Sequence, residues 1–374
     1  MTPVEHAPTV GEICRHLDAF APPALAAAWD NVGLLAGDPR APAAVVVCCL
    51  TLTPAVVAEA VAAGAGLVVA HHPVLFRGAK RLTPDTPDGR VLLPLLRHGV
   101  AVHSPHTAFD DCAGGINDGL ARRCGLTHVR PLRPAKTADG DRLKLVVFVP
   151  SPDVEIVADA LFASGAGVIG NYEQCSFRTP GTGTFFGTAA ANPQVGETGR
   201  REHVDETRLE VVVPAGKLAA VVAALRKAHR YEEPAFDVYP LRAEPDGGEG
   251  RIGELPAPEA LGSFAARVKR ELRASVVEVG GDPTRPVRRV ALACGAAGEY
   301  LADAVRQRAD VFLTGEMRFH DVLAAEAASV AVVLPGHYAT ERPGVEDLAA
   351  RLAAAFPAAK VFASTAERDP LAGV

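Results

Sequence analysis

Residues 45–73, which read "VVVCCLTLTPAVVAEAVAAGAGLVVAHHP", decide the fold class of this chain. The apolar run at 45–52 is typical of a buried parallel strand. Thr53 and Pro54 then predict a helix, because Thr is a good N-cap and Pro is well tolerated at the first helical position. A second apolar run at 67–70 predicts the next strand. Strand, helix and strand in this order indicate a mostly parallel sheet covered by helices.

The same alternation continues on both sides of a different middle segment. A helix near 88–98 is expected to lead to a strand at 100–104. The C-terminal part repeats the pattern, with expected strands at 287–294, 310–314 and 330–334 and helices near 298–309, 318–329 and 343–355. We therefore predict an α/β fold whose core consists of two α/β halves.

The middle segment has the order β-α-β-β-α-β, which is the ferredoxin-like motif. Its first strand is expected at 143–150, with Ser151 as the cap of the following helix. Stretches rich in proline and charge at 130–141 and 242–251 are interpreted as linkers. The predicted domains are 1–130 for the first core half, 131–246 for a ferredoxin-like α+β insert, and 247–374 for the second core half.

Composition limits the class of protein. The formal net charge of the 374 residues is −6, which disfavours a nucleic-acid partner. The seven cysteines are odd in number and form no CxxC pair, so reduced thiols are expected. The N-terminus lacks an apolar signal region, and no apolar run approaches the ~20 residues that span a bilayer. We expect a cytoplasmic protein without a membrane partner.

Polar residues gather where predicted strands end. His71 and His72 follow "LVVA", His103 and "PHTAFD" follow "VAV", "TGEMRFHD" follows "VFL", and "GHYATE" follows "VAVVLP". In open parallel sheets, ligands bind outside the carboxyl ends of the strands. We therefore expect one site at one edge of the sheet.

The residue types in this set point to metal binding. Imidazoles and carboxylates suit divalent Zn, Mn, Fe or Co. Neighbouring side chains at a strand end point in different directions, so His71 and His72 are better placed for two metals than for one. Asp110 lies four residues after His106, and Glu341 lies four residues after His337. A carboxylate between two metals with histidines on each is the usual arrangement of dinuclear hydrolases, which activate a water molecule.

Several longer motifs carry a family resemblance. They are "WDNVGLLAGD" (29–38), "AHHP", "SPHTAFDDCAGGIND", "GNYEQCSFRTPGTGTF", "YEEPAFDVYPL", "TGEMRFHD" and "GHYATER". Together they resemble the dinuclear-metal, hexamer-forming Nif-three-like family, whose members are usually named GTP cyclohydrolase 1 type 2. The resemblance runs from about residue 10 to 360.

The resemblance implies a ligand set, an assembly and an activity. The HH pair, the aspartate of HTxxD and the GHxxxE motif imply the metal ligands His71, His72, Asp110, His337 and Glu341. It also implies a toroidal homohexamer, a PII-like insert, and hydrolysis of a small molecule, GTP by the family name. The catalytic residues stay unassigned, with His106 and His320 as candidates. In the insert, His229-Arg230-Tyr231 departs from the His-Pro-Tyr that is frequent in the family.

Other interpretations stay open for most of these residues. His71 and His72 could be solvated histidines in a turn, Asp110 a turn residue, and Glu341 a glutamate that favours a helix N-terminus. His106 could orient a ligand or be an ordinary loop histidine. The segments Asp30-Asn31 and Glu316 could cap loops and helices or line the site. The turn 294–298, "CGAAG", could bind phosphate or be a plain tight turn.

Two alternative functions also stay open. The same site could act as a nucleotide phosphoesterase, because two metals also suit displacement at phosphorus. The chain could instead be a non-catalytic metal-binding scaffold or regulator.

Overall fold

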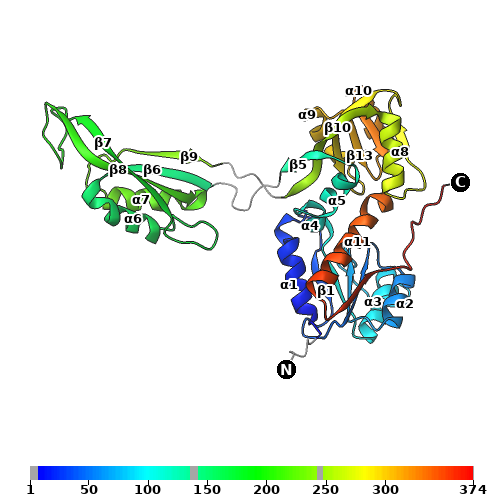
Figure 1. Ribbon diagram of the computed structural model, residues 1–374. Helices are drawn as coiled ribbons and strands as arrows, with labels where there is room; N and C mark the ends of the chain where they lie inside the picture. The colour runs from blue at the N-terminus through cyan, green and yellow to red at the C-terminus, as the bar shows by residue number, and fades with distance from the viewer. Residues whose placement is uncertain (1–6, 135–141, 242–246, 374) are drawn as a thin grey trace. The chain divides into compact units, whose positions relative to one another are not determined.

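The computed structural model describes residues 7–134, 142–241 and 247–373 (Figure 1). The chain divides into two compact units. The first unit comprises residues 1–135 and 245–374, and the second comprises residues 136–244.

The first unit contains a five-stranded sheet in the order β1-β4-β3-β2-β15. Its strands are β1 (Gly33–Ala36), β2 (Val45–Cys49), β3 (Leu67–Ala70), β4 (Ala101–Ser104) and β15 (Lys360–Ala363). All neighbours are parallel except β1 and β4. The parallel strands β2 and β3 lie side by side, as residues 45–73 predict.

Helices cover both faces of this sheet. They are α1 (Val10–Phe20), α2 (Pro54–Ala62), α3 (Pro87–Arg97) and α11 (His337–Ala355). Side chains of α2 and α3 form one apolar cluster with alternate residues of β2, β3 and β4. Thr53 caps α2 by accepting a hydrogen bond from the Val56 amide at 3.3 Å, and Pro54 occupies the first turn. The predicted helix start is thereby confirmed.

The second sheet of this unit has six strands in the order β11-β14-β13-β12-β10-β5. They are β5 (Thr127–Pro134), β10 (Gly248–Ala260), β11 (Glu278–Gly280), β12 (Pro286–Ala293), β13 (Val311–Thr314) and β14 (Ala331–Leu334). The three strands β12, β13 and β14 are parallel, and the other pairs are antiparallel. The remaining helices of the unit are α4 (His106–Asp111), α5 (Ile116–Arg123), α8 (Leu261–Glu271), α9 (Leu301–Arg306) and α10 (Phe319–Ala327).

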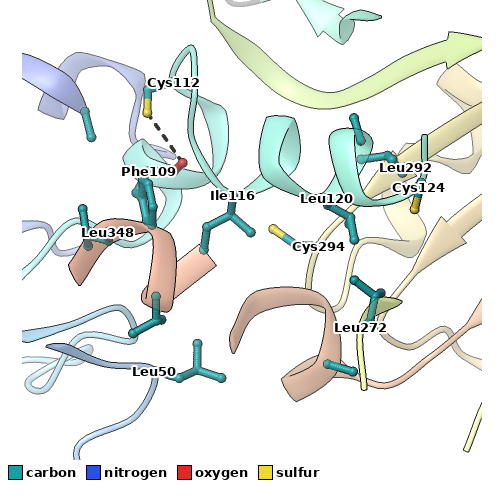
Figure 2. Close-up of a cluster of buried hydrophobic side chains, with 14 of the residues drawn as sticks. Leu50, Phe109, Cys112, Ile116, Leu120, Cys124, Leu272, Leu292, Cys294 and Leu348 are labelled. Carbon is teal, nitrogen blue, oxygen red and sulfur yellow. Dashed lines mark hydrogen bonds between the residues drawn. The ribbon is translucent and has the colours of Figure 1, made fainter. Parts of the chain in front are cut away.

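One apolar cluster joins the two sheets (Figure 2). It contains Leu50 from the end of β2, Ile116 and Leu120 from α5, Leu292 from β12 and Leu348 from α11, all at most 2 % exposed. Burying several leucines and isoleucines in one cluster stabilises the unit by roughly 1.5–3 kcal/mol for each side chain. The carboxyl ends of strands from both sheets are therefore held in a fixed relation.

The predicted core of two α/β halves is confirmed, but two strands lie in the sheet of the other half. Strand β5, from the first half, pairs with β10, and the final strand β15 pairs in parallel with β2 of the first sheet. The segments 130–134 and 248–251, predicted as linkers, are strand residues. Pro134 and Gly248 lie opposite each other in the β5–β10 ladder, so the chain leaves and re-enters the core at adjacent points. The rest of these linker predictions includes residues 135–141 and 242–246, which lie outside the described residues.

The second unit has the ferredoxin-like order. Its elements are β6 (Arg142–Pro150), α6 (Val154–Ala163), β7 (Ser176–Phe186), β8 (Arg201–Pro214), α7 (Leu218–Ala228) and β9 (Phe236–Pro240). The sheet order is β7-β8-β6-β9, and all pairs are antiparallel. Helices α6 and α7 cover one face of the sheet. The predicted cap at Ser151 is wrong, because Ser151 begins a short 3-10 turn and α6 starts after Asp153.

No helix in the described part of the chain is both long enough and apolar enough to cross a bilayer. The seven cysteines are free thiols, and all except Cys175 are buried.

Candidate metal centre

His71 and His72 are fixed by the backbone of the first sheet. The amides of His71 and His72 donate hydrogen bonds to the carbonyls of Cys49 and Leu50 at 2.9 and 2.8 Å, so the pairing of β2 and β3 continues through both residues. The Ser104 hydroxyl donates to the His71 carbonyl at 2.7 Å. The ring centroids of His71 and His72 are 5.2 Å apart, and the ring planes are inclined by 48°. The two imidazoles therefore enter the site from a rigid strand end.

The His71 ring is buried without a hydrogen-bond partner. It is 1 % exposed, and neither Nδ1 nor Nε2 is hydrogen-bonded in the described part of the chain. Its Nε2 lies 3.5 Å from Oδ1 of Asp110. Burial lowers the pKa of His71 well below its usual value, and burial together with Glu341 raises the pKa of Asp110. Both shifts disfavour an ion pair between the two side chains.

A cation between His71 and Asp110 would give the buried His71 ring the partner that it lacks among the described residues. A buried polar atom without a partner costs free energy, and neutral imidazole nitrogen with carboxylate oxygen is a good donor set for a divalent transition metal. His71 and Asp110 thus fit a metal ion better than they fit each other.

A second cluster is already held together by hydrogen bonds. Oε2 of Glu341 lies 3.0 Å from Nε2 of both His72 and His337. Although burial alone would raise it, these two hydrogen bonds hold the pKa of Glu341 well below its usual range. The hydrogen bond to Glu341 raises the pKa of His337 to about 9, with Glu316 adding to the effect.

The outer ring nitrogens of the histidines are fixed by other side chains. His72 Nδ1 pairs with the Thr51 hydroxyl at 2.8 Å, and His337 Nδ1 pairs with Oε1 of Glu316 at 3.0 Å. Such outer partners select the tautomer and orient the imidazole for a metal. In both residues Nε2 is the nitrogen that faces the cluster.

His106 has the same arrangement through Asp30. Its Nδ1 lies 2.7 Å from Oδ1 of Asp30, whose other oxygen accepts hydrogen bonds from the amide and hydroxyl of Thr107. Burial would raise the pKa of Asp30, but these hydrogen bonds dominate and lower it to about 2. The Asp30 carboxylate therefore accepts a hydrogen bond from Nδ1–H of His106, and in the neutral imidazole Nε2 then carries the lone pair.

These side chains form two overlapping groups that could hold metal ions. One group consists of His71, His72 and His106, and the other of His72, His337 and Glu341. Within each group the potential ligand atoms lie within 4.8 Å of one another. His72 belongs to both groups, and Asp110 adjoins the first through its 3.5 Å approach to His71.

The expectation that all strand ends share one sheet edge is wrong. His71 and His72 follow β3 and Asp110 lies on α4 after β4, both in the first sheet. Glu316 follows β13, and His337 begins α11 directly after β14, both in the second sheet. The residues come together because the carboxyl ends of the two sheets meet, which the common core of Figure 2 allows.

The turn 294–298 acts as a wall of the site. The amides of Cys294, Gly295 and Ala297 donate to Asn117, Thr340 and Thr314 side chains at 2.9, 3.0 and 3.2 Å. These N–H groups are therefore engaged and do not offer a phosphate cradle. A side chain at Gly295, whose φ is +65°, would collide with the Glu341 carboxylate. The plain tight turn was the better interpretation.

A cavity of about 560 Å³ opens beside the cluster. One wall is aromatic: the centroids of Trp29 and Phe76 are 5.7 Å apart, and the Trp29 ring is 6.1 Å from His106. Trp29 is 61 % exposed although it lines the cavity. Another wall carries Arg133 and Tyr300, with the guanidinium 4.7 Å from the ring centroid.

Two predicted histidines lie elsewhere. His320 is exposed at the start of α10 and is not among the residues that line this cavity. His103 is buried in β4, where its Nε2 pairs with Asp18 at 3.2 Å. Neither side chain is brought to the cluster.

Several supporting residues were not assigned from the sequence. Thr51 lies two residues after the end of β2, and this position near a strand end could have marked it as a candidate. The partnership of Asp30 with His106 joins positions 76 residues apart, and the Cys294 thiol donates to Asp110 Oδ1 at 3.2 Å across 184 residues. No local pattern encodes such pairs.

The chain is similar to known proteins over most of its length. Residues 8–370 match the profile of the family described as Duf34/NIF3 (NGG1p interacting factor 3). A protein of Mycobacterium tuberculosis named "GTP cyclohydrolase 1 type 2 homolog" is 40% identical over 338 residues, covering 89% of this chain and 88% of the relative. A Bacillus subtilis protein of the same name is 39% identical, covering 88% of each chain.

Solved structures agree with this match. A Bacillus cereus protein described as related to NIF3 superposes with a TM-score of 0.70 at 35% identity, covering 98% of this chain and 99% of the other. A Staphylococcus aureus protein superposes with a TM-score of 0.76 at 27% identity and the same coverage.

Proposed function

This chain belongs to the Duf34/NIF3 family, and from that premise we propose that it is a dinuclear metal-dependent hydrolase of a small, nucleotide-like molecule. The main support for the proposal is the environment of His71. Among the described residues, the His71 ring is buried with both nitrogens unpartnered and lies 3.5 Å from the Asp110 carboxyl group, beside a second His/Glu group. Such a pair is costly unless a cation completes it.

Two divalent ions of Zn, Mn, Fe or Co are proposed for the two groups. His71 and Asp110 would hold one ion, and His337 and Glu341 would hold the other. His72 belongs to both groups of potential ligands. Bound there, such ions would activate water and polarise the bond under attack.

His106 is the residue proposed to move the proton. Nδ1–H of His106 donates a hydrogen bond to Asp30, so the Nε2 lone pair of the neutral His106 ring is available on the side of the cluster. Nε2 would take the proton from the attacking water and return it to the leaving group. Asp30 acts as a positioning residue, because it fixes the tautomer of His106. His320 has no part in this scheme, because it lies exposed outside the cavity wall.

The cavity favours a substrate with a planar ring. Trp29 and Phe76 present exposed aromatic surface directly beside His106. Arg133, the single arginine among the residues that line this cavity, pairs with Glu249 at 2.6 Å and with Asp303 at 2.6 Å. The relatives' name suggests GTP, whose base is such a ring.

The proposal is tested by the products formed from GTP. The Mn- or Zn-loaded protein is incubated with GTP, and the products are identified by mass spectrometry. Formate and an opened purine are expected, and free phosphate would instead establish a nucleotide phosphoesterase. Unchanged GTP with every metal would contradict nucleotide hydrolysis and favour a non-catalytic scaffold.

Two variants make this assay specific. Asp110→Ala should abolish product formation because it removes a proposed metal ligand. Asp159→Ala is the matched control, since Asp159 is an exposed aspartate on α6 of the other unit. Equal activity of wild type and Asp110→Ala would assign the reaction to a contaminant or to another site.

Trp29 offers a readout of ring binding that does not need turnover. It is the single tryptophan of the chain, so intrinsic fluorescence reports on this wall alone. Guanosine should quench the fluorescence saturably, whereas ribose should not. Equal quenching by both compounds, or by neither, would remove the aromatic wall from the proposed binding site.

Assembly and location complete the proposal. We propose a cytoplasmic homohexamer, in line with the family resemblance and with seven free thiols. Native mass spectrometry should give a particle of six 38.9 kDa chains. A monomer at micromolar concentration would contradict it.

A further inference from the structure

The ferredoxin-like unit has a cavity of its own, of about 630 Å³. It lies on the sheet face that α6 and α7 leave uncovered: Leu145, Val147 and Val149 of β6 pack toward the helices, and Phe148 between them lines the cavity. Thr179 of β7 and Phe148 of β6 both pair with Arg208 of β8, so the floor spans three strands. This volume suits a small organic ligand.

A buried carboxylate forms one side of the cavity. Glu206 is only 8 % exposed, and among the described residues its carboxylate accepts a single hydrogen bond, from the Tyr231 hydroxyl to Oε1 at 2.8 Å. No ion pair to Glu206 occurs in that part of the chain. Its carboxylate lies over Gly183, where any side chain would collide with it. A buried carboxylate supported only by a neutral phenol lacks the cation that usually offsets desolvation.

The cations of this unit near the cavity already have partners. Arg208 pairs with Glu210 at 2.9 Å, and Arg230 pairs with Asp153 at 2.6 Å. The cavity is also lined by Glu232 and Glu233, so carboxylates outnumber Arg208 among its lining residues. A ligand that matches this lining carries positive charge.

Aromatic side chains also line the cavity. The ring centroids of Phe185 and Tyr231 are 6.1 Å apart at an interplanar angle of 65°, and Phe148 lies on the floor. Aromatic faces attract organic cations and also bury an apolar body. The Glu232 carboxylate accepts a hydrogen bond from the backbone amide of Asn192 at 3.2 Å, which holds the segment after β7 at the cavity.

We propose that this cavity binds a small organic cation, with its ammonium group against Glu206 and its apolar body between Phe148, Phe185 and Tyr231. A bare metal ion fits less well, because both groups of potential metal ligands in the described chain lie in the other unit. The proposal is independent of the proposed hydrolase activity.

The test compares two ligands of nearly the same shape on the full chain. Phenethylammonium carries the cation, and 2-phenylethanol replaces it with a neutral hydroxyl. Isothermal titration calorimetry should give a Kd of about 1 mM for the ammonium, as expected for a fragment of this size. The alcohol should bind at least about tenfold more weakly, a difference of ~1.4 kcal/mol.

Variants locate the site. Glu206→Gln should weaken phenethylammonium binding at least about tenfold, in the range of a charge-assisted hydrogen bond. Glu173→Gln, at an exposed glutamate of the same unit, should leave binding unchanged. Equal binding of the two ligands to the wild type, or no saturable binding of the ammonium at about 10 mM, would overturn the proposal. If Glu206→Gln folds and binds as the wild type does, the proposal is also overturned.

Discussion

The two parts of the metal cluster differ in how far the protein alone satisfies them. On the side of the second sheet, Glu341 is hydrogen-bonded to His72 and His337, each at 3.0 Å. On the side of the first sheet, the His71 ring has no hydrogen bond within the described part of the chain, and Oδ1 of Asp110 lies 3.5 Å from its Nε2. The Glu341 group is preorganised by charge-assisted hydrogen bonds, whereas the His71 and Asp110 side chains would be completed by the proposed cation. The fold alone gives the Glu341 carboxylate its partners, whereas the buried His71 ring would gain a partner only from the proposed cation.

The largest expected effect comes from removing Asp110. Asp110→Ala should lose at least one metal ion per chain without unfolding, because the carboxylate contributes little to the metal-free fold. Elemental analysis of the purified variant gives the stoichiometry, and circular dichroism checks the fold. Full occupancy in Asp110→Ala would remove Asp110 from the ligand set, and Asp159→Ala should retain the wild-type content.

Conservative amide substitutions should affect the stability of the metal-free protein to different extents. Glu341→Gln should lower the free energy of unfolding by about 2–4 kcal/mol, because it breaks a buried charged network. Asp110→Asn should change it by less than about 1 kcal/mol, because burial already favours the neutral acid and the amide oxygen can still accept from Cys294. Urea titration of both variants in chelator measures the difference. Equal losses would show that the two parts of the cluster do not differ.

A smaller effect is expected from the outer partner of His72. Thr51→Val removes the hydrogen bond to Nδ1 and should weaken metal affinity by about 10-fold, at the low end for such outer partners. Competition with a fluorescent chelator measures the affinity. Thr182→Val, at an exposed threonine in β7, is the control and should leave it unchanged. An unchanged affinity in Thr51→Val would mean that His72 is held by its backbone alone.

The smallest effect concerns pH in the metal-free protein. The pKa of His337 is raised to about 9, so its charged form contributes stability that is complete below the usual histidine pKa of about 6.5. That contribution is lost as the pH rises through about 9. The stability difference between wild type and His337→Gln should therefore shrink between these two values. A difference that grows with pH would contradict the charged pairing with Glu341.

The sequence could predict much of the fold because the signals were local. The run from 45 to 73 predicts the β2–α2–β3 unit, and the polar strand ends at His71, His72 and His337 point to a site. The pairing of β15 with β2 could not be predicted, because a four-residue strand carries almost no periodic signal. Nor could the division of the core into two sheets, since parallel strands of either sheet have the same apolar pattern.

The supporting residues of the site were hidden for a related reason. Asp30, Thr51 and Cys294 act through side-chain contacts to residues far along the chain, and their types are equally suited to caps, turns and cores. Only the packed structure brings each to its partner. The identity of the strand-end residues was readable, whereas the hydrogen bonds that orient them were not.

The central claim is that the cluster holds two metal ions, and anomalous X-ray diffraction from zinc-loaded crystals tests it most directly. The account predicts two anomalous peaks about 3.5–4 Å apart, one beside His71 and Asp110 and one beside His337 and Glu341. A single peak at Glu341, with His71 still unpartnered, would contradict it.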